Sequence, residues 1–370
     1  MPESRYIILY IIIKTIDFIL IIMYNKVNIK LLRGCDSLKT VKLNEASTSL
    51  VMIERGILDR VGELLDLNRR VLVLTDREVP KKYVDAVCLK CLYPVRVSVW
   101  PGKDTNSIDN YQRICEIMAE NSFAESDCVI SIGGERVLSL GSFVAATYKC
   151  GIDHYCMPTT FDSQIGNGFF GKKCVSLGDN KMVLGTEAMP KRVLVDAELL
   201  STLDQREMAN GFAEVIRLSL VLDKKLFAYL EKEDLERDKV IDHIVARAIE
   251  IKNYIFRKQG TEPELVEALE LGSIIADSME KTQFSYGERL AIAMIPMCSA
   301  DVKIRLRDLL SKAGLPVVWQ YDFERLFRDS VKGSEAQKIS LVMCDEVGSY
   351  RMDKLTVPEY HKLIKTAYGG

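Results

Sequence analysis

Runs of consecutive apolar residues alternate with segments of helical periodicity in the first half of the chain. The clearest runs are RVLVLT at 70–75 and CVISI at 128–132. An unbroken apolar run is typical of a parallel strand that is buried on both faces of its sheet. In the segments between such runs, apolar residues recur at intervals of three and four, which predicts helices. We therefore expect a parallel sheet with helices on both faces.

The elements of this first part are placed by residue number. Strands are predicted within 39–55 and at 70–75, 95–100, 128–132, 155–158 and 192–196. Helices are predicted at 56–65, 79–89, 108–121 and 137–148.

The pattern changes after Asp196, where helical periodicity dominates. The predicted helices are 206–230, 235–257, 265–281, 287–313 and 323–332. Two further segments, 338–344 and 349–354, flank the turn sequence DEVG and predict a hairpin. We expect an α/β domain over 38–196 and a mostly helical domain over 197–370, with residues 1–37 outside both.

Residues 6–23 within that N-terminal extension are almost continuously apolar. Their sequence, YIILYIIIKTIDFILIIM, is nearly long enough to span a bilayer. Lys14 and Asp17 interrupt it, and each would cost about 2.5–3.5 kcal/mol at the centre of a membrane helix. A secretory signal requires a cleavage site of small residues after the apolar segment, and none follows here. A membrane anchor, a start upstream of the true initiator and an extra packed segment are the three alternatives; we expect a dispensable extension.

The composition is that of a globular protein. There are 50 lysine and arginine residues and 52 acidic residues, for a net charge of −2 at pH 7. This balance predicts no nucleic-acid partner. The 10 cysteines are scattered through predicted strands and helices, which suits free thiols in the cytoplasm. Cys88 and Cys91 form the one CxxC pair, and we expect two buried thiols there, with a zinc or redox role as the alternative.

The most specific chemical signal lies in residues 269–294, LELGSIIADSMEKTQFSYGERLAIAM. In this segment Ser273 and Asp277 lie one helical turn apart, and Tyr286 precedes a Gly-Glu pair. The other marks are Gly133-Gly134, 143–148, 151–153, 158–160, Gly171-Lys172, Lys181, 193–196, 211–216 and 250–252. In their order and spacing these motifs resemble the 3-dehydroquinate synthases, over residues 38–364.

This resemblance implies a fold and a reaction. The fold would be a Rossmann-like NAD-binding domain followed by a helical domain with a catalytic zinc ion, the active site lying in the cleft between them and a homodimer being usual. The reaction would convert a small phosphorylated sugar, 3-deoxy-D-arabino-heptulosonate 7-phosphate, to 3-dehydroquinate with loss of phosphate. NAD would serve in a transient oxidation, and zinc would polarise the hydroxyl group that is oxidised.

The zinc site that the resemblance implies is altered. Glu214 matches the family's glutamate ligand, but Ser273 and Tyr286 stand where the family has its two histidine ligands. Asp277 stands in the place of a further histidine. Neutral serine and tyrosine oxygens are poor zinc ligands. We expect the chain not to bind zinc, with a hard cation on Glu214 and Asp277 as the alternative.

The cofactor site is altered in its phosphate turn. The family's GGGxxxD reads GGERVLS at 133–139, so Glu135 adds bulk and a negative charge where a pyrophosphate approaches. We expect weakened NAD binding. The residues that would bind NAD by resemblance are Asp76, Gly133, Gly134, Ser139, Thr159 and Thr160.

The substrate site keeps several basic residues. By resemblance Lys172, Lys252 and Asp277 are candidate catalytic residues, and Lys181 and Arg217 would bind the substrate. Arg217 stands where the family has a lysine, which keeps the charge but changes the reach. The family's Gln-x-Asp motif reads QIG at 164–166, so its carboxylate is missing.

Three functional hypotheses follow. The first is a 3-dehydroquinate synthase homologue with lost or strongly reduced zinc-dependent activity. The second is a regulatory protein that binds a small anion or nucleotide, or a partner subunit of an active synthase. The third is a repurposed enzyme that uses Glu214 and Asp277 as acid and base without metal. We expect a cytoplasmic location, with membrane association only if residues 6–23 are an anchor.

Overall fold

The computed structural model describes residues 38–42, 49–178, 180–279, 282–318, 322–331 and 338–368. The contacts divide the chain into residues 1–40 and 41–370, and the fold described below is that of the second unit. Residues 6–23, and with them the question of an anchor, lie outside the described residues. Within the described residues, no helix combines the length and the apolar character that crossing a membrane needs.

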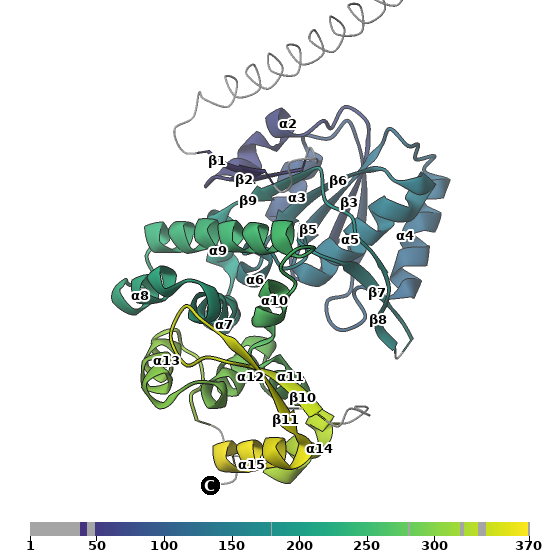
Figure 1. Cartoon of the computed structure of the whole chain (residues 1–370). Coiled ribbons are helices and arrows are strands. Elements are labelled where there is room, and N and C mark those ends of the chain that lie inside the picture. The colour runs from purple at the N-terminus through teal and green to yellow at the C-terminus, as the bar shows by residue number, and fades with distance from the viewer. Residues whose placement is uncertain are drawn as a thin grey trace, which may run out of the picture. The chain divides into compact units, whose positions relative to one another are not determined.

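The main sheet has its strands in the order β1-β2-β9-β6-β5-β3-β4 (Figure 1). Every pairing from β2 to β4 is parallel. The runs predicted as buried strands form its centre, because their side chains are buried on both faces. This confirms the predicted parallel α/β fold. The strands are β1 (Lys39–Lys42), β2 (Leu50–Ile53), β3 (Arg70–Asp76), β4 (Tyr93–Val99), β5 (Cys128–Gly133), β6 (Asp153–Pro158) and β9 (Arg192–Val195).

Helices α3, α4 and α5 lie where the sequence predicts them. The deepest is α5, which packs against β5 and against a hairpin that the sequence pattern did not predict. That hairpin pairs β7 (Lys173–Leu177) with β8 (Asn180–Thr186), and β8 is too exposed to show a strand pattern. The helices of this part are η1 (Ile57–Arg60), α2 (Val61–Leu64), α3 (Lys81–Cys88), α4 (Ile108–Glu120), α5 (Glu135–Thr147), η2 (Tyr148–Cys150), α6 (Phe161–Gln164) and η3 (Ala197–Thr202).

The part after η3 is mostly helical, but three helices that the sequence predicts as continuous are interrupted. Asp223 ends the first, and its carboxylate caps the next helix by accepting two backbone N–H groups at 3.0 and 3.1 Å. Gly272 breaks the second with a left-handed φ of 79°. The third passes through a 3-10 turn that contains Pro296. The helices are α7 (Gln205–Leu222), α8 (Lys224–Lys232), α9 (Asp238–Lys258), α10 (Glu264–Glu267), η4 (Ala268–Glu270), α11 (Ser273–Ser278), α12 (Tyr286–Met294), η5 (Ile295–Met297), α13 (Ala300–Lys312) and α14 (Phe323–Val331).

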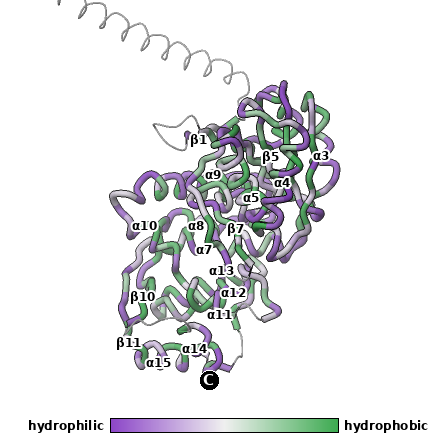
Figure 2. The backbone as a smooth tube through the Cα atoms, turned by 90° about the vertical axis from the view of Figure 1, so that its right-hand side faces the viewer, coloured by the Kyte–Doolittle hydropathy of each residue, from purple (hydrophilic) through white to green (hydrophobic). Residues whose placement is uncertain are grey.

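The predicted hairpin is confirmed as the antiparallel pair of β10 (Lys338–Met343) and β11 (Arg351–Thr356). It leads into α15 (Val357–Tyr368), which the sequence pattern did not predict. One hydrophobic core joins the sheet to α7 and α12, and hydrophobic stretches in β5 and α7 stand out in Figure 2. The predicted domain boundary between residues 196 and 197 stays a prediction.

Candidate functional site

Three neighbouring parallel strands, β3, β5 and β6, end at one edge of the sheet. Asp76 ends β3, Gly133 ends β5, and Thr159 and Thr160 follow β6. The backbone N–H of Thr159 donates to the Gly133 carbonyl at 3.1 Å, and Asp76 Oδ1 accepts two backbone N–H groups of the next turn at 2.9 and 3.1 Å. Ligands of open α/β sheets bind at this edge, so the predicted cofactor residues near it are in the expected place for a dinucleotide.

The turn from β5 into α5 is closely packed. A Cβ on Gly133 would lie 3.0 Å from Cβ of Val137, and one on Gly134 would lie 3.4 Å from Cγ2 of Thr160. Glu135 is the first residue of α5, and its side chain is exposed. A carboxylate therefore stands at a helix N-terminus, where its charge opposes an approaching phosphate group.

Ser139, another predicted cofactor residue, is buried on α5. Its hydroxyl donates to the Cys174 carbonyl and accepts from the Cys174 N–H, both at 3.2 Å. These two hydrogen bonds join α5 to β7, so the backbone of β7 binds the hydroxyl group of Ser139.

The lysines before and within the β7–β8 hairpin differ in burial. Lys172 and Lys181 are exposed, on the loop before β7 and on β8. Lys173, which the sequence did not single out, is 1% exposed, and its Nζ donates to the Phe170 carbonyl at 2.5 Å. Burial lowers the pKa of Lys173 to about 8, against the opposing effect of nearby acidic groups.

Lys252, on α9, reaches the loop that follows α6. Its Nζ donates to Oδ1 of Asn167 at 2.5 Å. A Cβ on Gly166 would lie 2.9 Å from Cδ of Lys252, and the φ of Gly166 is 116°, which favours glycine. A carboxylate side chain at position 166 would therefore push against the lysine that occupies this place.

Glu214 and Arg217, one turn apart on α7, form a buried ion pair. Nη2 of Arg217 lies 2.9 and 2.7 Å from the two carboxylate oxygens, and Nη1 donates to Ser273 Oγ at 2.9 Å. The side chain of Arg217 is 10% exposed and that of Glu214 is 7% exposed. Burial opposes the charge of Arg217, but Glu214 together with Tyr286 and Glu270 raises the pKa of the guanidinium above its ordinary value.

Two more carboxylates, Glu135 and Asp162, interact with the same groups. Desolvation raises the pKa of both, and neighbouring carboxylates, Glu214 among them, raise it further. Desolvation also lowers the pKa of Lys252, and Arg217 adds to this effect while Glu214 opposes it. We name Glu135, Asp162, Lys173, Glu214, Arg217 and Lys252 the charged cluster. Glu135 is the exposed member of the charged cluster.

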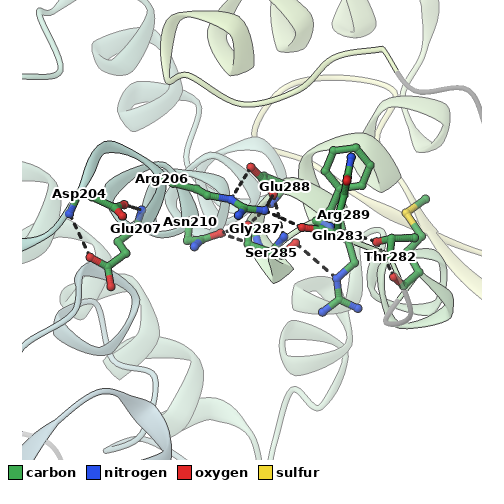
Figure 3. Close-up of polar contacts among 12 residues, drawn as sticks. Asp204, Arg206, Glu207, Asn210, Thr282, Gln283, Ser285, Gly287, Glu288 and Arg289 are labelled. Carbon is green, nitrogen blue, oxygen red and sulfur yellow. Dashed lines mark hydrogen bonds and ion pairs between the residues drawn. The ribbon is translucent and has the colours of Figure 1, made fainter. Parts of the chain in front are cut away.

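The start of α12 is fastened to α7 next to this cluster. The amide oxygen of Asn210 accepts from Ser285 Oγ at 2.5 Å and from the N–H of Gly287 at 3.0 Å (Figure 3). A Cβ on Gly287 would lie 2.5 Å from Cα of Asn210, so only glycine allows this approach.

An ion pair makes a second contact between the two helices. Arg206 donates to both carboxylate oxygens of Glu288, at 2.9 and 2.6 Å, and to the Gln283 carbonyl at 2.7 Å (Figure 3). These contacts hold Tyr286, the first residue of α12, near the buried ion pair of Glu214 and Arg217. Burial raises the pKa of Tyr286, and Arg217 opposes this effect.

The hydrogen bonds of Glu214, Ser273 and Tyr286 decide whether these side chains could bind a zinc ion. Arg217 takes up both oxygens of Glu214 and the hydroxyl of Ser273, and Tyr286 offers a phenol that stays protonated at neutral pH. Asp277 is exposed on α11. Across the part of the chain that the structure describes, no three His, Cys, Asp or Glu side chains gather closely enough to hold a metal ion. This donor set does not fit zinc.

Two members of the cluster, Asp162 and Lys173, and the neighbouring Asn167 were not predicted from the sequence. All three lie in the segment after Thr159-Thr160, whose glycines and polar residues were the one available signal. Asp162 accepts from Thr160 Oγ1 at 2.5 Å.

The chain matches two family descriptions. Residues 96–210 match "3-dehydroquinate synthase N-terminal", and residues 211–332 match "3-dehydroquinate synthase C-terminal". A 3-dehydroquinate synthase of Thermoanaerobacter pseudethanolicus is 29% identical over 358 residues, covering 88% of this chain and 99% of the relative. That of Caldanaerobacter subterraneus subsp. tengcongensis is 31% identical over 304 residues, covering 76% and 85%.

Solved structures share the fold at lower identity. A 2-deoxy-scyllo-inosose synthase complexed with carbaglucose-6-phosphate, NAD+ and Co2+ has a TM-score of 0.79 at 17% identity, covering 89% of this chain and 100% of that one. A 2-epi-5-epi-valiolone synthase from Streptomyces hygroscopicus subsp. jinggangensis, with NAD+ and Zn2+ bound, has a TM-score of 0.74 at 19% identity, covering 90% and 98%. Both likenesses confirm the predicted two-part fold.

Proposed function

Since the chain belongs to the 3-dehydroquinate synthase family, we propose that it is a homologue whose metal-dependent turnover is lost or strongly reduced. The reaction concerned is the conversion of 3-deoxy-D-arabino-heptulosonate 7-phosphate to 3-dehydroquinate and phosphate. One observation carries the proposal: the carboxylate at the predicted metal site is bound by Arg217, and the two other ligand positions offer neutral oxygens.

The expected loss follows from what a catalytic metal contributes. A divalent ion that polarises a substrate oxygen supplies several kcal/mol of transition-state stabilisation. A serine hydroxyl and a protonated phenol cannot assemble such a site beside a carboxylate that is already paired. Lys252 supplies an ammonium group beside Glu214 and Arg217, which supports binding of a substrate more than its turnover.

The cofactor that we propose for this chain is NAD. Related structures were solved with NAD+, and the edge formed by β3, β5 and β6 carries the glycine turn and Asp76 as a dinucleotide site would. Binding is proposed to be weak, because the Glu135 carboxylate lies at the N-terminus of α5 where the pyrophosphate would approach.

The experiment follows phosphate release by the purified full chain with Zn2+, NAD and 3-deoxy-D-arabino-heptulosonate 7-phosphate. The synthase of Thermoanaerobacter pseudethanolicus, in the same buffer, is the active reference. We expect release no faster than in a metal-free control, with the protein folded by circular dichroism. Metal-dependent release at a rate near that of the reference would contradict the proposal.

A second function is supported by lysines at positions that match the family. Lys172 and Lys181 are exposed before β7 and on β8, Lys252 is partly buried on α9, and an ammonium group can bind an anion by a charge-assisted hydrogen bond. The chain would then bind a small anion or nucleotide as a regulatory protein, or act as the partner subunit of an active synthase. Thermal-shift titrations with sugar phosphates, NAD and nucleotides test the first, and no stabilisation by any of them counts against it.

The subunit hypothesis has its own test. The family resemblance suggests a homodimer, and two related chains that share this fold could form a mixed dimer. Native mass spectrometry of co-expressed chains should then detect the mixed species. Exclusive homodimers of each chain would remove this role.

A further inference from the structure

We propose that the guanidinium of Arg217 is a built-in cation that takes the place of the divalent metal ion. The inference rests on the proposed function only in taking Glu214, Ser273 and Tyr286 as the positions of the metal site. It goes further, because it assigns Arg217 as the cation bound by Glu214 and states which substitution would allow a metal ion to bind there instead.

The geometry brings the ligand positions around one guanidinium. Nη2 of Arg217 donates to both oxygens of Glu214, at 2.9 and 2.7 Å, and Nη1 donates to Ser273 Oγ at 2.9 Å. Tyr286, the third position, is close enough to Arg217 to interact with it electrostatically. The guanidinium therefore links α7 to α11 through two of the ligand positions, as a metal ion there would.

The charge at the site also matches a guanidinium. Glu214 contributes one negative charge and the two other ligand positions contribute none, so a single positive charge neutralises the site. A guanidinium keeps its proton under all ordinary conditions, so its charge is as permanent as that of a metal.

The identity of the residue matters as well as its charge. Arg217 turns back by one helical turn to reach Glu214 and at the same time extends to the neighbouring helix. A planar fork of donors can make both contacts at once, whereas a lysine ammonium offers one point of charge. Nε of Arg217 is buried and has no hydrogen-bond partner among the described residues. The two terminal nitrogens thus make all the hydrogen bonds of this side chain, which fixes the guanidinium between the ligand positions.

The consequence is competition between two cations. A metal ion can bind Glu214 only if the guanidinium leaves, and the guanidinium is then left buried without a partner. Arginine at position 217 is therefore a barrier to metal binding that is independent of the missing histidines.

The experiment compares two variants that differ only at position 217. One carries Ser273→His and Tyr286→His, and the other carries both of these with Arg217→Lys. Each is titrated with Co2+ while the visible d–d absorption is recorded, and bound metal is counted by native mass spectrometry. We expect the variant with Arg217→Lys to bind one Co2+ about tenfold to a hundredfold more tightly than the variant that keeps arginine. Equal affinities would overturn the proposal.

A second measurement uses the unmodified protein and does not depend on the folding of the variants. Its thermal unfolding midpoint should be unchanged by EDTA, Zn2+ or Co2+, whereas Arg217→Met should lower it in the absence of metal. One Co2+ bound by the unmodified protein, and lost in Glu214→Gln, would overturn the proposal. The two proposals fail distinguishably: bound metal without turnover contradicts only this inference, whereas metal-dependent turnover contradicts the proposed function as well.

Discussion

The Nζ atom of Lys252 lies 2.5 Å from Oδ1 of Asn167, and this contact joins α9 to the loop after α6. The loop owes its position to Gly166, where any side chain would push against the lysine. The amide thus holds a desolvated ammonium group at the edge of the charged cluster.

The first prediction concerns the removal of this acceptor. Asn167→Ala leaves the ammonium group of Lys252 without the amide, so the free energy of unfolding should fall by about 1–3 kcal/mol. Urea denaturation measures the change. Asn180→Ala, at an exposed position on β8, is the control and should change stability by less than about 0.5 kcal/mol. Equal effects of the two substitutions would show that the contact contributes nothing.

The second prediction concerns the approach of α12 to α7. Gly287→Ala places a Cβ 2.5 Å from the backbone of Asn210, so the helix must shift, at a cost of about 1–3 kcal/mol. At Gly260 an added Cβ meets nothing within 4 Å, and Gly260→Ala is the matched control. Thermal unfolding of both variants checks this. A Gly287→Ala variant as stable as the control would mean that the two helices are less tightly joined than described.

The third prediction is a pH dependence that originates at His154. Its ring accepts or donates hydrogen bonds with Ser131 at 2.9 Å and Ser142 at 3.0 Å, and burial lowers its pKa to about 3. The unfolded chain takes up this proton at a pKa of about 6.5. Between these values the unfolded state binds more protons, so stability falls as the pH falls.

The size of this effect follows from the same two values. From about pH 7 to about pH 5 the free energy of unfolding should fall by about 2 kcal/mol through His154. His154→Gln, although less stable at every pH, should lack this contribution. Urea denaturation of both proteins at the two pH values measures the difference, and parallel curves would contradict the assignment.

The fourth prediction concerns the dinucleotide turn. Glu135→Gly removes the carboxylate at the start of α5, so NAD should bind more tightly, by about tenfold or about 1.4 kcal/mol. Isothermal titration calorimetry provides the dissociation constants. Arg136→Ala, at the exposed neighbouring position, controls for a general change at this helix end. An unchanged affinity in Glu135→Gly would show that the carboxylate does not weaken binding.

The fifth prediction separates the two members of the buried ion pair. Glu214→Gln leaves the guanidinium of Arg217 buried without a counter-ion, and the loss in unfolding free energy should be about 3–5 kcal/mol. The double variant with Arg217→Met should lose less than the sum of the two single losses, because it removes both charges. A double-mutant cycle by urea denaturation measures this coupling, and strict additivity would mean that the two groups do not interact.

Much of the fold followed from the sequence because its main elements are marked by local patterns. The runs at 70–75 and 128–132 are buried on both faces, and their short length and β-branched residues favour strands over buried helices. Helix ends were harder to place. Asp223 ends one helix by capping the next, and Gly272 ends another by adopting a left-handed conformation. Each interruption depends on a single residue, and the apolar periodicity continues across it.

The candidate site was predictable only where a motif identified it. Glu214, Arg217 and Lys252 were singled out by resemblance, and the structure brings them into one cluster. Lys172 and Lys173 are adjacent in sequence, yet the second is buried and the first exposed, because the β7–β8 hairpin turns only one of them inward. Such a choice depends on a hairpin without a sequence pattern, so it was not accessible from the chain alone.

Helix α7 carries both the contacts that hold α12 and two members of the charged cluster. Arg206, Asn210, Glu214 and Arg217 follow one another at spacings of four, four and three residues, which puts them on one face of the helix. A rotation of α7 about its own axis would therefore move the ion pair and the anchor of Tyr286 together. A ligand that draws Arg217 away from Glu214 should therefore also loosen the first turn of α12. Amide hydrogen exchange at that turn would then report binding at the charged cluster.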